Sequence, residues 1–206
     1  MNVSIFKPNR KSTGAAGHFQ IGQKGDEEPT FFLRVTQQHS WDDARKTGSF
    51  SGNTKEPSKN VVIKFNEFEL GEIVNAFRNK SAWSSYHDFN DVKISITLSP
   101  WQKKVGKGDN VREYTAFGLS ITRNGVDKFK LPIEPGEGVR LESLVNTFYA
   151  YIDEARRIKN LSFVKPTNGG SSGSSGPTGP TSTTSGTAGS SGGTGAVMNE
   201  DDEPDF

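Results

Sequence analysis

The stretch VVIKFNEFELGEIVNAF, Val61–Phe77, decides the fold, because it joins a β-strand directly to an α-helix. VVIKF has the β-branched and aromatic composition of a strand. Apolar side chains then recur at the i, i+3, i+4, i+7 spacing of an amphipathic helix, at Leu70, Ile73, Val74 and Phe77. Asn66 is suited to cap this helix, with Glu67 and Glu69 in its first turn. The sequence therefore predicts a strand followed at once by a helix that packs on a core.

A second stretch, KFKLPIEPGEGVRLESLVNTF at Lys128–Phe148, repeats this plan of basic strand, acidic helix start and apolar helix. Its helix is expected over Gly138–Ile158. The apolar face of that helix comprises Leu141, Leu144, Val145, Phe148 and Ile152. The match between the two stretches is one of pattern rather than identity, and it indicates an internal repeat of supersecondary structure.

Further strands precede each of these units. They are expected at Val3–Phe6, His18–Gly22 and Thr30–Gln37 before the first helix, and at Val92–Ser99 and within Tyr114–Ile133 before the second. The polar segment His39–Asn60 is expected to be a long loop, and the basic, glycine-rich Lys103–Asn110 a mobile loop between two strands. The fold class is therefore α+β, with two antiparallel β-sheet-plus-helix units in pseudo-repeat. An OB-fold barrel is the alternative.

The hairpin around Asn124-Gly125 has a register that the hydrophobic pattern constrains. A three-residue loop, Arg123–Gly125, pairs Leu119 with Phe129 and Phe117 with Leu131, whereas a two-residue loop places leucine and isoleucine opposite lysines. A slip of one residue moves every side chain to the other face, so the pattern favours the three-residue loop. Lys128 and Lys130 then share a wet, basic face with Gly118, Ser120 and Thr122.

Charge and composition divide the chain into a body and a tail. Residues 1–165 hold all 25 Lys and Arg and 19 acids, a net charge of +6, whereas the last seven residues hold five acids. Between them, residues 166–197 form a Gly/Ser/Thr/Pro segment that we expect to be a flexible linker, with a reach of about 30 Å. Residues 198–206, MNEDDEPDF, form an acidic tip that ends in phenylalanine. A basic body with an acidic tail suggests a polyanion-binding surface and a competitor for it.

Several classes of chemistry lack support in the sequence. It has no cysteine, no run of about 20 apolar residues, and no signal peptide, so we expect a soluble, cytoplasmic protein. It has no nucleophile elbow, zinc-protease or P-loop motif, so we expect no enzyme, cofactor or metal site. We expect His39, Asp42 and Asp43 to be solvated side chains of a polar loop. We expect His87 to form a structural hydrogen bond or to stack on a ligand.

Basic residues interleaved with aromatic ones point instead to single-stranded nucleic acid. Lysine and arginine neutralise phosphates, and exposed rings stack on unpaired bases. Phenylalanines on the predicted core faces (Phe65, Phe77, Phe117, Phe129 and Phe148) are excluded. The candidate binding residues are Lys7, Arg10, Lys11, Arg34, Trp101, Lys103, Lys104, Lys107, Tyr114, Arg123, Lys128 and Lys130.

The tail and the order of elements each resemble a known family. The uncharged linker followed by EDDEPDF, Glu200–Phe206, resembles the tail of bacterial and phage single-stranded-DNA-binding proteins, although the residue before the terminal Phe206 is Asp205 rather than proline. In that family the tip recruits replication and repair proteins and competes with DNA. The tip residues that this resemblance marks as partner-binding are Asp201, Asp202, Glu203, Asp205 and Phe206. The body, by its order of elements, looks like the Whirly family, which binds single strands through sheets.

We therefore expect a sequence-nonspecific single-stranded DNA-binding protein that acts in DNA replication, recombination or repair, with a phage origin favoured by the resemblance. Its expected partners are single-stranded DNA and, through the tip, replication or repair proteins, with no membrane contact. A homo-oligomer is compatible with the sequence. The alternatives are a protein-interaction scaffold that binds no nucleic acid and an RNA-binding module.

Overall fold

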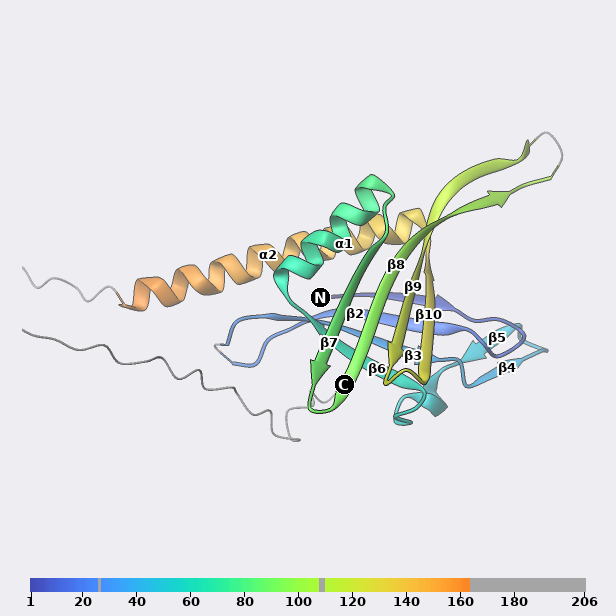
Figure 1. The fold of residues 1–206 in the computed structure, drawn as a ribbon, viewed down its shortest axis with the longest axis horizontal. Coiled ribbons are helices and arrows are strands. Elements are labelled where there is room, and N and C mark those ends of the chain that lie inside the picture. The colour runs from blue at the N-terminus through green and yellow to red at the C-terminus, as the bar shows by residue number, and fades with distance from the viewer. Residues whose placement is uncertain (26, 108–109, 164–206) are drawn as a thin grey trace, which may run out of the picture. The chain divides into compact units, whose positions relative to one another are not determined.

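Two open, four-stranded antiparallel sheets, each followed by a helix, form the body in the computed structural model, which describes residues 1–25, 27–107 and 110–163 (Figure 1). The first sheet has the order β1 (Asn2–Lys7), β2 (Ala15–Gly22), β3 (Thr30–Gln37), β6 (Asn60–Phe65), and α1 (Glu67–Asn79) follows it. The second has the order β10 (Asp127–Ile133), β9 (Arg112–Arg123), β8 (Val92–Val105), β7 (Trp83–Phe89), and α2 (Pro135–Phe163) completes it.

This arrangement confirms the α+β class and the repetition of sheet plus helix. The OB-fold alternative is wrong, because both sheets are open and each has its own helix. The linker and the tip expected at 166–197 and 198–206 lie outside the described residues. None of the helices in the described part of the chain is long and apolar enough to cross a membrane.

Two segments differ from the prediction. His39–Asn60 is not only loop, since it holds the hairpin of β4 (Ser40–Asp42) and β5 (Thr47–Ser49) and a short 3-10 helix, Ser51–Asn53. The Asp42 carboxylate closes the turn of this hairpin by accepting hydrogen bonds from the backbone N–H of Ala44 and Arg45, a local signal that periodicity does not detect. Strand β7 was missed, because even its inward residues are only half-buried.

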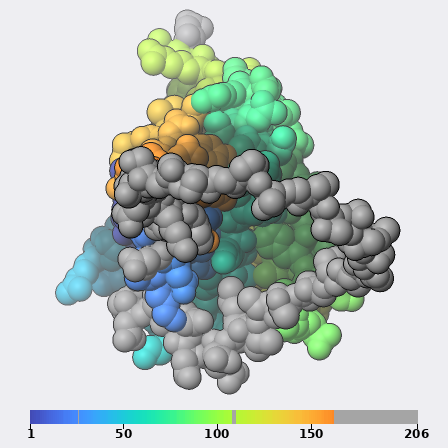
Figure 2. Space-filling view, turned by 90° about the vertical axis from the view of Figure 1, so that its left-hand side faces the viewer, coloured from blue at the N-terminus to red at the C-terminus, as the bar shows by residue number. Residues whose placement is uncertain are grey.

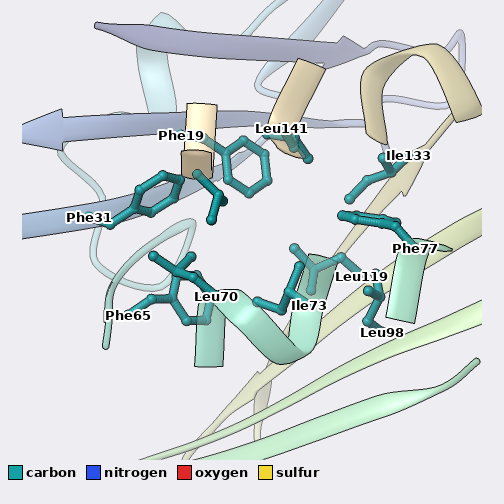
Figure 3. Close-up of a pocket in the computed structure, with 11 residues that line it drawn as sticks. Phe19, Phe31, Phe65, Leu70, Ile73, Phe77, Leu98, Leu119, Ile133 and Leu141 are labelled. Carbon is teal, nitrogen blue, oxygen red and sulfur yellow. The ribbon is translucent and has the colours of Figure 1, made fainter. Parts of the chain in front are cut away.

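One core joins both sheets and both helices. Figure 3 shows side chains from all four elements pointing into the same interior, among them Phe31, Leu70, Leu119 and Leu141. The gap left between them is only about 20 Å³, which is room for roughly one water molecule, so this interior is packing and not a ligand site. The phenylalanines that the sequence assigned to core faces contribute to this cluster, Phe77 as a half-buried member.

The helices are anchored at their first turns. Asn66 Oδ1 accepts a hydrogen bond from the N–H of Glu69, and the Glu69 carboxylate accepts one from the N–H of Asn66, which completes a capping box and confirms the predicted cap. In α2, Pro135 occupies the first position, where its missing N–H costs nothing. The helices lie side by side (Figure 2), and the Tyr149 hydroxyl of α2 donates to the carbonyl of Glu67 in α1.

Because the helices and the inner sheet faces share this one core, the outer faces of both sheets remain without a covering helix. Their outward side chains are mostly exposed or half-buried, and none belongs to the core cluster. The fold therefore presents two open sheet surfaces.

Candidate nucleic-acid interface

Strands β8 and β9 continue past the core as a two-stranded arm. Their pairing is unbroken from Ile94↔Arg123 to Val105↔Arg112, and Figure 1 shows the far end standing clear of the helices. We call Trp101–Val105 together with Arg112–Thr115 the β8–β9 arm. The predicted loop at Lys103–Asn110 is thus shorter than expected, because its first three residues belong to β8.

A lysine between two aromatic rings lies at the base of this arm. Lys103 Nζ is 5.9 Å from the ring centroid of Trp101 and 5.9 Å from that of Tyr114, the range of a cation–π contact. Glu134 accepts hydrogen bonds from Lys103 and from the Tyr114 hydroxyl, the latter at 2.8 Å. Trp101 remains 43% exposed, so part of its ring is open to a ligand.

The charges in this cluster hold each other in the ionised state. The hydrogen bond to Glu134 raises the pKa of Lys103, and the hydrogen bond from Lys103 lowers the pKa of Glu134. Lys103 is therefore a cation at all physiological pH values. Its charge is partly neutralised in place by a carboxylate, which a phosphate would have to displace or share.

Lys104, further out on the arm, and Lys107, just beyond the end of β8, are exposed. Lys104 Nζ lies 3.9 Å from a carboxylate oxygen of Glu113 across the hairpin, a weak surface ion pair. Both ammonium groups are therefore accessible to a protein or a nucleic acid.

The outer face of the second sheet continues the same side of β8 and β9. Lys128 lies in a row with Thr122, Ser95 and Tyr86, and the next row runs Lys130, Ser120, Thr97, Ser84. Both lysines are exposed and the hydroxyl-bearing side chains are exposed or half-buried. The predicted wet, basic face is therefore confirmed.

The register of the β9–β10 hairpin differs from the predicted one by two residues, so each side chain stays on the face predicted for it. The loop has three residues, but they are Asn124–Val126, and Arg123 pairs with Asp127. Consequently Leu119 faces Leu131 and Phe117 faces Ile133, so the predicted pairings with Phe129 and Leu131 are wrong. Asn124 and Gly125 both have positive φ, and the N–H of Val126 donates to the carbonyl of Arg123 at 3.1 Å, so a tight turn at Asn-Gly is followed by a bulge.

Among the N-terminal basic residues, Lys7 is placed apart from Arg10 and Lys11. Lys7 forms an ion pair of 2.8 Å with Glu137 and lies near enough to Glu134 to help lower its pKa, so it flanks the base of the arm. Arg10 pairs with Asp43 at 3.0 Å beside the β4–β5 hairpin, and Lys11 is exposed next to it.

Arg123 is engaged in the fold. Its guanidinium forms an ion pair of 2.7 Å with Asp127 and donates to the carbonyls of Asn60 and Pro57, which ties the second sheet to the start of β6. Only 18% of its side chain is exposed. We therefore omit Arg123 from the interface proposed below.

Arg34 lies on the other open surface, the outer face of the first sheet, between His18 of β2 and Val62 of β6. The structure therefore does not gather the predicted residues on one surface. Most lie on or beside the β8–β9 arm and the outer face of the second sheet, Arg10 and Lys11 lie beside the β4–β5 hairpin, and Arg34 lies on this outer face of the first sheet. Sequence reasoning did not select Phe6 and Phe32, which share this face with Arg34, although the strand alternation could have placed them there.

His87 serves local structure. His87 Nε2 forms a hydrogen bond of 2.7 Å with Glu69, which also accepts one from Ser85. Burial disfavours the charged Glu69, but these hydrogen bonds bring its pKa below the usual value. This network fixes β7 against the first turn of α1 and confirms a structural hydrogen bond for His87. Within the described ranges, no group of three or more His, Asp or Glu is placed to hold a metal ion.

Comparisons with known proteins gave similarity in structure only. No protein-family model matches the chain, and the search of curated proteins found no match. The chain is similar to WHY1 from Arabidopsis thaliana, with 15% identity, a TM-score of 0.48, and coverage of 80% of this chain and 94% of that one. The corresponding values are 17%, 0.48, 82% and 90% for the plant transcriptional regulator PBF-2, and 15%, 0.48, 78% and 92% for Arabidopsis WHY3. Likeness at this level assigns no function to the chain.

Proposed function

We propose that the body binds single-stranded DNA with little sequence preference. The observation that carries this proposal is the continuous outer side of β8 and β9, where the Trp101–Lys103–Tyr114 cluster of the arm runs into the hydroxyl-rich face that bears Lys128 and Lys130. We call this surface the arm face. Lys104, which the register places on the opposite side of the arm, and Lys107, just beyond the end of β8, add exposed cations nearby, and Lys7 flanks the base of the arm.

This surface suits an unpaired strand better than a duplex. Lysines contact phosphates irrespective of sequence, and a ring such as that of Trp101 needs a base face, which a duplex keeps stacked. Serine and threonine hydroxyls donate to phosphates or base edges without demanding a particular base.

The proposed biological role is protection or handling of single-stranded DNA in replication, recombination or repair, with a phage origin among the possibilities that the tail suggests. The acidic tip, with Asp201, Asp202, Glu203, Asp205 and Phe206, is proposed to recruit a partner protein and to compete with DNA for the basic body. Five acids against a body of net charge +6 supply the charge complementarity for this competition.

A titration of the full chain with fluorescently labelled oligo-dT and oligo-rU, at low and at physiological salt, tests the proposal. We expect saturable binding of oligo-dT that weakens steeply as salt increases. Absence of binding to both would favour a protein-interaction scaffold, and a marked preference for oligo-rU would favour an RNA-binding module.

A triple variant locates the site. Lys103→Gln, Lys104→Gln and Lys107→Gln together remove three cations from the arm and the residues just beyond it. None of the three belongs to the core, so the affinity for oligo-dT should fall strongly at low salt while the melting temperature stays close to that of the wild type. Arg140→Gln, at an exposed cation of α2, is the matched control. Equal affinities of the triple variant and the control would place the site elsewhere.

A further inference from the structure

The outer face of the first sheet is a second open surface with its own chemistry. The register aligns Ser4, His18, Arg34 and Val62 across the four strands in one row, and Asn2, Gln20, Phe32 and Lys64 in the next. A third row, at the end toward the β4–β5 hairpin, runs Phe6, Ala16, Thr36, Asn60. These three rows define what we call the first-sheet face.

No carboxylate occurs at the outward positions of these four strands, all of which lie in the described part of the chain. The outward residues are Asn2, Ser4, Phe6, Ala16, His18, Gln20, Gly22, Thr30, Phe32, Arg34, Thr36, Asn60, Val62 and Lys64. Arg34 and Lys64 are the fixed cations among them. The face is therefore basic and carries no acid of its own, although the chain as a whole has nearly equal numbers of basic and acidic residues.

Apolar side chains are exposed on this face together with the cations. Phe6 is 54% exposed and Val62 43% exposed, and Phe32 is half-buried. Two partly exposed phenylalanines on an otherwise polar sheet are consistent with an interaction surface.

The rings are held in place by their neighbours. The His18 ring accepts or donates a hydrogen bond of 2.9 Å with the Ser4 hydroxyl and meets the Phe6 ring edge-on, with centroids 5.3 Å apart. A Cβ added at Gly22 would lie 3.3 Å from Cε2 of Phe32, so the glycine leaves the room in which the Phe32 ring lies along the sheet. Burial, and the charge of Arg34 nearby, lower the pKa of His18. At neutral pH it is therefore an uncharged ring between a phenylalanine and an arginine.

We propose that the first-sheet face is a second contact surface for single-stranded nucleic acid, on which Phe6 and Phe32 stack against unpaired bases while Arg34 and Lys64 contact phosphates. This inference rests on the proposed function and extends it from one surface to two. An acidic protein partner would also meet the cations, but it would gain little from two separate phenylalanine rings, whereas bases stack on rings of any orientation that are open on one side.

The positions of the two rings set the path of the strand. Phe6 and Phe32 lie on strands two apart in the sheet, about 10 Å across it, and four residues apart along it, about 13 Å. No single base can contact both. A bound strand must therefore cross the first-sheet face diagonally, over His18, which lies midway between the two rings in the register, and beside Arg34 in the same row.

Photo-crosslinking of the full chain to oligo-dT substituted with 5-iodouracil, followed by mass spectrometry of the peptides, tests this directly. We expect crosslinks to Phe6 and Phe32 as well as to Trp101 or Tyr114. Crosslinks confined to the arm would overturn this inference and leave the proposed function standing. If oligo-dT neither binds nor crosslinks, both are wrong.

Variants give a second, independent measurement. Phe6→Leu and Phe32→Leu keep an apolar side chain but remove the ring face, and each should weaken oligo-dT binding about five-fold or more. Phe68→Leu, at a phenylalanine of α1 that is 78% exposed, is the matched control and should bind as the wild type does. Thermal unfolding checks that all three variants fold. If both first-sheet variants fold and bind oligo-dT with wild-type affinity, the phenylalanines do not stack on bases and the inference is wrong. The same result is expected if this face binds an acidic protein instead.

Discussion

Lys103 forms an ion pair with Glu134 while its ammonium group lies between the rings of Trp101 and Tyr114. The four side chains come from β8, β9 and the residue that precedes α2, so the base of the arm is tied to the start of the last helix. The arrangement places a permanent cation beside an exposed ring, and it also gives that cation an internal counter-ion.

Glu134→Gln should therefore strengthen binding of oligo-dT. The amide retains an acceptor for the Tyr114 hydroxyl but removes the negative charge, so Lys103 can neutralise a phosphate completely. We expect a rise in affinity of a few-fold at low salt and a plot of log affinity against log salt that is steeper by about 0.7. A fall in affinity would mean instead that Glu134 acts by positioning Lys103 against the two rings.

Gly17→Ala should destabilise the fold through the contact between the sheets. A Cβ at Gly17 in β2 would lie 2.3 Å from Cδ2 of Leu131 in β10, and Leu131 is itself fully buried, so it has no space into which to move. Overpacking of this kind costs about 1–3 kcal/mol in the free energy of unfolding. Gly136→Ala, in the first turn of α2 with open space around it, is the control and should be neutral or slightly stabilising.

The regular parts of the fold were predictable because their burial is periodic. Val61–Phe77 shows the two-residue period of a strand and then the 3.6-residue period of a helix. The structure places its strand, cap and helix as the sequence indicates. Trp83–Phe89 could not be recognised in the same way, because its inward positions include Ser85 and His87, whose polar groups are satisfied by Glu69 of α1. That compensation exists only in the tertiary structure.

The candidate site was less predictable than the fold, because charge counts do not reveal ion pairs between distant segments. Arg123 and Lys130 look alike in sequence, yet one bridges β9 to the start of β6 and the other is exposed. Phe6 was missed for the opposite reason. An aromatic residue in a predicted strand is most often core, and strand alternation places Phe6 on the outer side of β1 but does not show that it faces His18, which the register does.

His18 should make the stability of the protein depend on pH near neutrality. Burial, with Arg34 close by, lowers the pKa of His18 in the folded state, so the unfolded chain takes up a proton more readily as the pH falls below about 6.5. The stabilisation is present above that value and is lost as the pH falls toward the folded-state pKa. In His18→Gln, the melting temperature should decrease less between pH 7.5 and 5.5 than in the wild type. His39→Gln, at an exposed histidine, should retain the wild-type decrease.

Lys128→Gln combined with Lys130→Gln should reduce the salt dependence of DNA binding. Both ammonium groups are exposed on the outer face of the second sheet, where each can neutralise one phosphate. The slope of log affinity against log salt should become less steep by about 1.4, because each phosphate contact to a single strand contributes about 0.7. Arg140→Gln should leave the slope unchanged. An unaltered slope in the double variant would restrict the interface to the arm.

Deletion of residues 198–206 should raise the affinity of the chain for oligo-dT at low salt. The deletion removes five acids that can compete with phosphates for a body of net charge +6, and the gain should disappear at high salt, where both interactions are screened. Phe206→Ala separates charge from recognition, because it retains all five acids and removes only the ring. It should bind oligo-dT as the wild type does, so a Phe206→Ala variant that reproduced the gain of the deletion would show that the ring, rather than the charge, competes with DNA.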